Sequence, residues 1–176
     1  MSESTKRHKA EAPKKLNFAI FICSTSRYQK LIHGESFRDE SGELIEHYVK
    51  MAGHTVVLRS IIPDDRQKIE ESMSEALQRQ DVDAVVFCGG TGIAPSDVTI
   101  ETVTPLLEKI LPGFGELFRL LSYRDIGSAA LLSRAIAGTA KGKVFFCIPG
   151  SPDAVKLSFE KLILPEAAHI VKHARE

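Results

Sequence analysis

A glycine-rich segment lies directly after an apolar stretch near the middle of the chain. It reads Gly89-Gly90-Thr91-Gly92. Because glycine has no Cβ, the backbone can approach a ligand closely there, and successive N–H groups can surround an anion. The segment lacks both the Lys-Ser/Thr ending of a Walker A loop and the spacing of a GxGxxG fingerprint. It predicts a loop that binds a phosphate-bearing ligand, and a tight strand-to-helix turn without a ligand is the alternative interpretation.

Two carboxylates stand at predicted strand–helix junctions. Asp97 follows the glycine-rich segment, and Asp64 follows the second predicted strand. Each could simply cap a helix. Beside a phosphate site, however, a carboxylate would repel the ligand unless a cation bridges them, and Mg²⁺ is often held by one or two carboxylates together with substrate phosphates. Asp64 and Asp97 are therefore the predicted magnesium ligands, with helix capping as the alternative.

Other polar residues offer less specific chemistry. Residues 24–26 (Ser-Thr-Ser) follow the first apolar run and could donate hydrogen bonds to a ligand or form a solvated loop. No serine stands in a G-x-S-x-G elbow, which argues against a hydrolytic triad. His169 and His173 are spaced four residues apart on the last predicted helix and could bind a metal, although the favoured interpretation is surface or packing residues.

Apolar runs alternate with helical patterns along the chain. Strands are expected at 16–23, 54–62 and 82–88 and as two short strands within 134–148, and helices at 40–52, from 64, 97–110, 116–121, 126–132 and 153–172. This alternation predicts an α/β fold with a mostly parallel sheet covered on both faces. Ligands bind beyond the carboxyl ends of such strands. The segments after three strands, at 24–26, 89–92 and 149–151, should therefore converge, whereas 24–29 is expected to be a loop.

Composition limits the class of protein. The 176 residues are 43% hydrophobic and carry 23 basic and 23 acidic side chains, for a formal net charge of +0. This predicts one domain, no nucleic-acid partner and, without an apolar run of roughly 18 residues, no membrane span. Residues 1–15 form a basic stretch without a secretory signal, predicted as a flexible tail, or a weak tether to anionic surfaces, before a domain at 16–176. Three cysteines without CxxC spacing favour buried packing residues in a cytoplasmic protein, more than a redox role.

Seven short motifs occur in order along the chain. They are Asp39-Glu40-Ser41-Gly42, Gly53-His54, Ile62-Pro63-Asp64-Asp65, Gly89-Gly90-Thr91-Gly92 with Asp97-Val98-Thr99, Pro112-Gly113-Phe114-Gly115-Glu116, Leu132-Ser133-Arg134-Ala135 and Pro149-Gly150-Ser151-Pro152. The ordered set resembles the MoaB/Mog family of molybdopterin-binding proteins, and the resemblance runs from about Leu16 to the last helix. A single Gly-Gly-Thr-Gly would be weak evidence, whereas the ordered set is specific.

The resemblance implies a fold, an activity and an assembly. The implied fold is a three-layer α/β/α domain whose mostly parallel sheet has one antiparallel strand. The implied reaction is adenylylation of molybdopterin by Mg²⁺-ATP, giving adenylyl-molybdopterin and pyrophosphate; the alternative is a catalytically silent molybdopterin-binding or carrier protein. A generic nucleotide-binding or structural oligomer unrelated to pterins is a third class. A homo-trimer or hexamer and a separate metal-insertion partner are also implied.

The resemblance also implies roles for particular residues. Asp97 and Asp64 match the two aspartates associated with activity. The implied ligand-binding residues are Ser24, Thr25, Ser26, Gly89, Gly90, Thr91, Gly92, Glu116, Ser133, Gly150 and Ser151. One position departs from the family, because Ser96 stands where active members often carry an arginine, and serine cannot supply that charge. Arg27, Arg134 and Lys143 are the cations considered as replacements.

Overall fold

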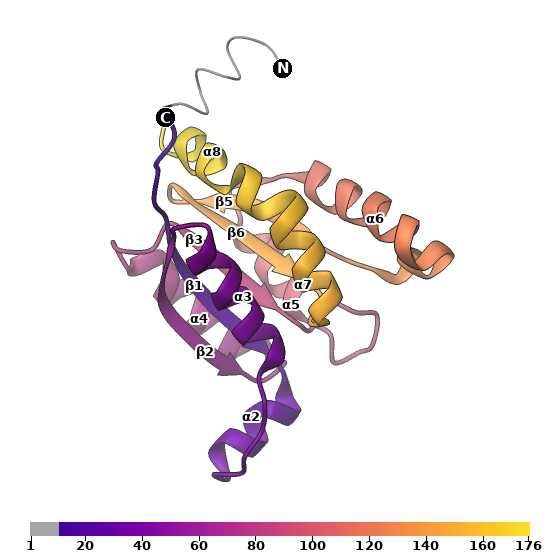
Figure 1. The fold of residues 1–176 in the computed structure, drawn as a ribbon. Coiled ribbons are helices and arrows are strands. Elements are labelled where there is room, and N and C mark those ends of the chain that lie inside the picture. Colours follow the sequence, from indigo (N-terminus) through magenta and orange to yellow (C-terminus); the bar gives the residue numbers. More distant parts are fainter. Residues whose placement is uncertain (1–10) are drawn as a thin grey trace.

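The structure is a computed structural model that describes residues 11–176. A six-stranded sheet with the order β2-β1-β3-β6-β5-β4 forms its centre (Figure 1). The strands are β1 (Asn17–Cys23), β2 (Thr55–Ile62), β3 (Ala84–Cys88), β4 (Lys109–Ile110), β5 (Ile136–Ala140) and β6 (Lys143–Ile148). Neighbours among β2, β1, β3 and β6 are parallel, and β5 is antiparallel to both β6 and β4. The prediction of a mostly parallel sheet with one antiparallel strand is confirmed.

Helices cover both faces of this sheet. They are α2 (Thr25–Ile32), α3 (Glu40–Met51), α4 (Arg66–Gln78), α5 (Thr99–Val103), α6 (Pro112–Ile126), α7 (Pro152–Ser158) and α8 (Leu164–Ala174), the last two joined by a π-helical turn (Phe159–Ile163). One apolar cluster joins the sheet to α3, α6, α7 and α8, and a second joins it to α4 and α5. The predicted three-layer α/β/α fold is therefore confirmed.

Alternation along β1 shows how the sequence builds these two cores. Phe18, Ile20 and Ile22 belong to the first apolar cluster, whereas Ala19 and Phe21 belong to the second. Successive side chains of a strand point to opposite faces, so an uninterrupted apolar run supplies both layers. This is why such a run predicts a strand buried on both sides.

Three local predictions are wrong, each for an identifiable reason. Residues 25–29 belong to α2, and Ser24 is its N-cap, where its side chain accepts a hydrogen bond from Arg27 N. The helix expected at 97–110 ends at Val103; a short 3₁₀ turn (Thr104–Leu106) and β4 follow, since Pro105 has no N–H for a continuing helix. The helix expected at 116–121 is longer than predicted, because α6 begins at Pro112, whose fixed φ suits the first turn.

Most of the basic stretch predicted as a flexible tail lies outside the described residues, because the description begins at residue 11. No helix within 11–176 is both long and apolar enough to cross a membrane. On α6, Phe114 and Phe118 are buried in the core whereas Leu117 is 49% exposed.

Candidate functional site

Three loops meet at the carboxyl edge of the sheet. Gly89, after β3, donates from N to Ile148 O of β6 at 3.0 Å. Its φ is +108°, and a Cβ built there would overlap Cys23 O at the end of β1. A Cβ on Gly150 would lie 3.3 Å from Gly89 Cα. The predicted convergence of the segments after β1, β3 and β6 is confirmed, and glycine permits it because a side chain would separate the strand ends.

Asp64 and Thr99 lie against Gly90 in this loop. Gly90 has a φ of +62°, and a Cβ there would overlap Thr99 Oγ1 and stand 2.7 Å from Asp64 Oδ1. Thr99 N donates to Gly90 O at 3.0 Å. Thr99 Oγ1 is buried and has no hydrogen-bond partner by distance and angle among the described residues, but it lies near the Cys23 thiol and lowers the pKa of that thiol.

Thr25 fixes the orientation of the Asp64 carboxylate. Asp64 Oδ2 accepts hydrogen bonds from Thr25 N at 2.8 Å and Thr25 Oγ1 at 3.0 Å, and Asp64 N donates back to Thr25 Oγ1 at 2.9 Å. Oδ1 is thereby turned toward Gly90. The N-cap of α4 is Asp65, which accepts from Lys68 N at 3.0 Å. The alternative that Asp64 caps this helix is therefore wrong.

Asp97 lies at the other end of the glycine loop. A Cβ on Gly92 would stand 2.6 Å from Asp97 Oδ2, which accepts a hydrogen bond from Ala94 N at 2.9 Å. The helix that follows has Val98 as its N-cap and no side-chain cap, so Asp97 does not cap it either. Both predicted carboxylates thus contact one loop, at Gly90 and at Gly92.

Arg134 holds the outer side of the same loop. Its Nε donates to Thr91 O at 2.9 Å and its Nη2 to Gly92 O at 2.6 Å. Its Nη1 pairs with Glu101 Oε1 at 2.5 Å, and this guanidinium keeps the pKa of Glu101 below its usual value. Since two loop carbonyls are turned toward Arg134, their orientation is fixed by a side chain more than forty positions away in sequence.

The other two cations considered as replacements for the arginine are placed differently. Arg27 Nη1 lies 3.4 Å from Asp39 Oδ1. Lys143 lies at the start of β6, at the amino edge of the sheet, and its Nζ donates to Val82 O at 2.8 Å. Of the three, only Arg134 lies at the glycine loop.

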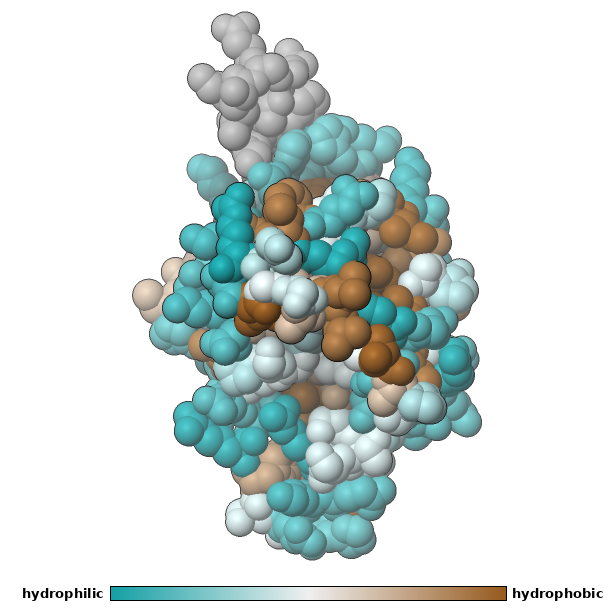
Figure 2. Space-filling model, turned by 90° about the vertical axis from the view of Figure 1, so that its right-hand side faces the viewer, coloured by the Kyte–Doolittle hydropathy of each residue, from teal (hydrophilic) through white to brown (hydrophobic). Residues whose placement is uncertain are grey.

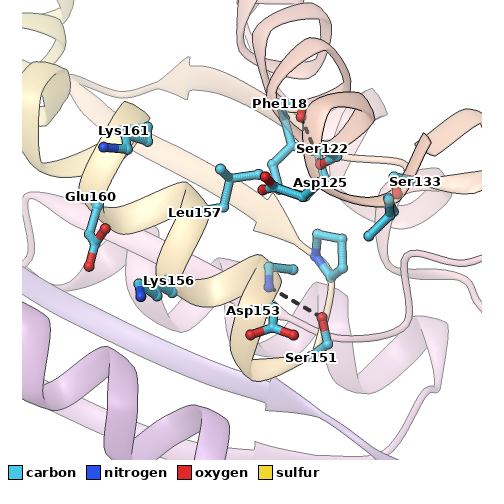
Figure 3. Close-up of a pocket in the computed structure, with 13 residues that line it drawn as sticks. Phe118, Ser122, Asp125, Ser133, Ser151, Asp153, Lys156, Leu157, Glu160 and Lys161 are labelled. Carbon is cyan, nitrogen blue, oxygen red and sulfur yellow. Dashed lines mark hydrogen bonds between the residues drawn. The ribbon is translucent and has the colours of Figure 1, made fainter. Parts of the chain in front are cut away.

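Two neighbouring hollows adjoin this edge. The first, of about 320 Å³, is lined by Gly89, Gly90, Thr91, Gly92, Asp97, Leu132, Ser133, Arg134, Pro149 and Gly150. The second, of about 590 Å³, lies between α6 and α7 (Figure 3). Ser133 and Pro149 line both hollows, so the two are adjacent. Ser151 lines the second hollow and also caps α7 by accepting from Ala154 N at 3.3 Å.

The remaining predicted site residues are less closely tied to the hollows. Ser24 Oγ lies 3.3 Å from Ser26 Oγ in the first turn of α2. Glu116 is exposed on α6 and lines neither hollow. Its predicted contact with a pterin therefore stays a prediction.

Sequence reasoning missed the charged residues of the larger hollow, which include two aspartates. Asp125 near the end of α6 and Asp153 at the start of α7 both line it, together with the apolar side chains of Phe118 and Leu157. Figure 3 shows the α6 residues across the hollow from α7. Asp153 stands two residues after Ser151, which was predicted as a site residue. No pattern marks Asp125, because its place depends on how α6 packs on the sheet.

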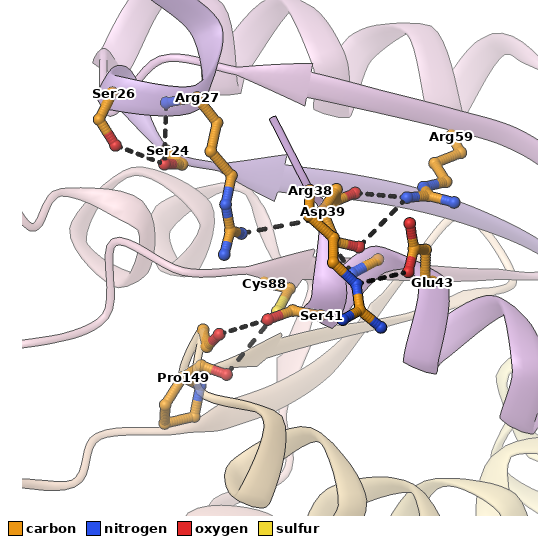
Figure 4. A network of polar contacts seen from close by, with 12 residues as sticks. Ser24, Ser26, Arg27, Arg38, Asp39, Ser41, Glu43, Arg59, Cys88 and Pro149 are labelled. Atoms are coloured by element: carbon orange, nitrogen blue, oxygen red, sulfur yellow. Dashed lines mark hydrogen bonds and ion pairs between the residues drawn. The ribbon is translucent and has the colours of Figure 1, made fainter. Parts of the chain in front are cut away.

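A buried carboxylate anchors α3 beside the loop after β6. Asp39 is 6% exposed and pairs with Arg59 Nη2 at 2.6 Å and with Arg27. Two residues on, Ser41 Oγ donates to Gly150 O at 2.6 Å (Figure 4). A carboxylate this buried is stable only with such partners. The acidic motif that begins at Asp39 therefore positions the Pro149–Gly150 turn.

The three cysteines are buried, as predicted. Burial raises the pKa of the Cys23 thiol to about 12, with the nearby Thr99 hydroxyl acting in the opposite direction. Burial likewise raises the pKa values of Cys88 and Cys147. A thiol needs its thiolate form to act as a nucleophile or metal ligand, so these cysteines serve packing.

The donor groups at the loop suit a cation shared with a ligand. Within residues 11–176, no cluster of three or more His, Cys, Asp or Glu side chains could hold a metal ion. Asp97 lines the smaller hollow and Asp64 does not, although both lie against the glycine loop. Phosphate oxygens would have to supply further ligands to an ion held there, as is common for Mg²⁺. The hydroxyl of Thr99 also lies against Gly90, where it could contact such an ion or a phosphate.

The family and the relatives that this chain resembles are all named for molybdopterin or for molybdenum cofactor biosynthesis. Residues 19–169 match the family described as a probable molybdopterin binding domain. Molybdenum cofactor biosynthesis protein B of Bacillus anthracis is 48% identical over 168 residues, covering 95% of each chain. The probable molybdopterin adenylyltransferase of Methanocaldococcus jannaschii is 40% identical over 163 residues, covering 93% of this chain and 96% of its own.

A solved structure shows the same fold along nearly the whole chain. The crystal structure of the tungsten cofactor synthesizing protein MoaB from Pyrococcus furiosus has a TM-score of 0.81 and 40% identity, covering 94% of this chain and 100% of that one. Family match, sequence identity and fold agree over the region that contains both aspartates and the glycine loop. The chain therefore belongs to the MoaB/Mog family of molybdopterin-binding-domain proteins.

Proposed function

We propose that this protein transfers the adenylyl group of ATP to molybdopterin, giving adenylyl-molybdopterin and pyrophosphate. The observation that carries the proposal is the contact of both aspartates with one glycine loop, Asp64 at Gly90 and Asp97 at Gly92. The name of the relative from Methanocaldococcus jannaschii, a probable molybdopterin adenylyltransferase, supports the same reaction. The product would pass to a separate metal-insertion protein.

The chemistry requires two polyanions to meet. The terminal phosphate of molybdopterin attacks the α-phosphorus of ATP, and the bond to the pyrophosphate leaving group breaks. Mg²⁺ held by Asp64 and Asp97 would neutralise charge on the phosphates. Backbone N–H groups of the glycine loop add fixed dipoles at the site. The chain itself contributes mostly position and charge, as is usual for phosphoryl transfer.

The two hollows suit the two ends of molybdopterin. The smaller one, bounded by the glycine loop, suits phosphate groups. The larger one offers apolar contact from Phe118 and Leu157. Its charged lining consists of three carboxylates and two ammonium groups, those of Asp125, Asp153, Glu160, Lys156 and Lys161. A pterin ring is flat and carries N–H donors along one edge, which carboxylates accept well. Ser133 lines both hollows and would lie between ring and phosphate.

One observation favours a silent carrier as the second candidate. Ser96 is exposed and carries no charge at the position where the resemblance expects an arginine. Arg134, the cation nearest the loop among those considered, already uses its donors on two loop carbonyls and Glu101. A carrier would bind molybdopterin in the same hollows without using ATP.

Pyrophosphate release separates the two candidates. Purified protein is incubated with ATP and Mg²⁺, with and without molybdopterin, and binding of molybdopterin is titrated in parallel. Pterin-dependent release supports the adenylyltransferase. Pterin binding without release refutes it and supports the carrier. Absence of both would refute the assignment of the hollows.

We also propose that the protein assembles as a homo-trimer or a hexamer through α6. Leu117, Leu120 and Tyr123 are 49%, 53% and 61% exposed and are spaced three residues apart on this helix. Figure 2 shows hydrophobic residues gathered on the face that carries α6. Contiguous exposed apolar surface of this kind is typical of protein contacts. Light scattering on the purified protein tests this, and a monomer at all concentrations would refute it.

A further inference from the structure

Two histidine rings face each other on α8, away from the glycine loop. His169 Nε2 and His173 Nε2 lie 3.0 Å apart, and the ring centroids are 4.8 Å apart. Residues four apart lie on the same side of a helix, which explains the pairing. Nearby, Arg175 Nη2 pairs with Asp83 Oδ1 at 2.6 Å, just before β3. The two histidines are therefore at the amino edge of the sheet, opposite the glycine loop.

The partners of the other two ring nitrogens determine where the protons are. His169 Nδ1 lies 3.0 Å from Glu166 Oε2, and His173 Nδ1 lies 2.8 Å from Glu176 Oε2. An ionised carboxylate only accepts hydrogen bonds, so each Nδ1 must carry a proton. A neutral imidazole has one proton, and both Nε2 atoms then present lone pairs to each other. Such a pair is stable when a proton or a cation lies between the two nitrogens.

We propose that His169 and His173 bind a borderline divalent transition-metal ion through their Nε2 atoms. At a metal–nitrogen distance of about 2.1 Å, nitrogens 3.0 Å apart subtend about 90° at the ion. This angle suits the tetragonal geometry of Cu²⁺ and Ni²⁺, and Zn²⁺ would need a slightly wider separation.

The surroundings of the pair favour a cation. Glu166 and Glu176 orient the two rings as carboxylates orient metal-binding histidines in other proteins, by holding the Nδ1 proton. Lys172 is the cationic side chain between them in sequence, and it pairs with Glu11 Oε2 at 3.0 Å and Glu176 Oε1 at 2.9 Å. Its charge is therefore balanced by carboxylates, and it opposes a bound cation only weakly.

Metal titration of the full chain, free of any affinity tag, tests this inference. NiCl₂, CuCl₂ and, as a negative control, MgCl₂ are titrated calorimetrically against the wild type, H169A, H173A and H33A. His33 is exposed at the end of α2 and serves as the matched control. We expect one Ni²⁺ or Cu²⁺ per chain in the wild type and in H33A. Each of H169A and H173A should weaken binding about tenfold or more.

A second variant separates a built site from an adventitious pair of histidines. In the double variant E166Q/E176Q the Nδ1 protons lose their carboxylate acceptors, and affinity should fall by about tenfold, as for other outer-shell partners of metal ligands. Ni²⁺ should also raise the Tm of the wild type and not that of H169A, because the ion binds the folded helix. Equal binding by the wild type and H173A would overturn the proposal, as would unchanged affinity in E166Q/E176Q.

Discussion

The polar side chains at the two edges of the sheet support different parts of the fold. At the amino edge, Lys143 Nζ donates to the carbonyls of Arg79 and Val82, and Asp83 accepts from Asn17 N and pairs with Arg175. At the carboxyl edge, Arg134 donates to two carbonyls of the glycine loop, and Ser41 Oγ donates to Gly150 O.

Hollows occur at both edges. The amino edge carries one of about 400 Å³, and the carboxyl edge carries one of about 320 Å³ at the glycine loop and one of about 590 Å³ beside it. The difference lies in the backbone, because the carboxyl edge presents a loop of glycines against which Asp64 and Asp97 lie. Since glycine lets a ligand approach the backbone closely, a ligand is expected at the carboxyl edge.

Replacing Asp97 with asparagine should produce the largest effect. The amide oxygen of the new side chain can still accept the hydrogen bond from Ala94 N, so the turn is kept while the charge is lost. Adenylylation should fall to background, whereas molybdopterin affinity should stay within about tenfold, or roughly 1.4 kcal/mol. Pyrophosphate release measures adenylylation, and pterin titration measures molybdopterin affinity. Unchanged turnover would remove the proposed role of Asp97 as an ion ligand.

Replacing Gly90 with valine should produce the next largest effect. A side chain there would overlap Thr99 Oγ1 and crowd Asp64, and a positive φ adds strain of about 1–2 kcal/mol. Ligand affinity, measured by titration with ATP or molybdopterin, should fall to an undetectable level.

Gly34→Val is the matched control for this change. Gly34 has a similar φ, +70°, but no atom lies within 4 Å of its ideal Cβ. The Gly34→Val variant should lose stability through backbone strain and keep its affinity for the ligand. If both variants bind equally well, the close approach at Gly90 is only structural.

Replacing Lys143 with methionine tests the difference between the two edges by a change at the amino edge. Two backbone carbonyls lose their buried donor, which should lower the free energy of unfolding by about 1–3 kcal/mol. Chemical denaturation measures this change. Pyrophosphate release per folded molecule should be unchanged, because Lys143 lies at the opposite edge from the loop. A loss of turnover in a folded variant would contradict the division between the edges.

The sheet and the meeting of its loops could be predicted from sequence. Continuous apolar runs specify strands buried on both faces, and parallel strands bring their carboxyl ends to one edge. Predictions that depend on competition between neighbouring residues were less successful. Asp64 and Asp65 could both cap α4, and only the structure shows that Asp65 does, leaving Asp64 for Thr25 and the loop.

Contacts between distant side chains could not be predicted. Ser41 and Gly150 are 109 positions apart, and Arg134 reaches carbonyls more than forty positions away. Such pairs follow from the packing of helices on the sheet, which residue patterns do not encode. Arg134 was considered only as a source of charge, whereas the structure places it as a support for the loop.

The smallest effect is expected at Glu101, the residue that pairs with Arg134 beside the glycine loop. Glu101 pairs with Arg134 at a partly exposed position, so Glu101→Gln should cost at most about 1 kcal/mol. Arg134 lowers the pKa of Glu101 in the folded protein, so the ion pair contributes stability above the unfolded value of about 4.3 and loses it as pH falls through the folded value. The difference in unfolding free energy between the wild type and Glu101→Gln should therefore be present at pH 7 and vanish in acid. A pH-independent difference in denaturation would mean that Glu101 acts through packing, and that Arg134 needs no partner to hold the loop carbonyls.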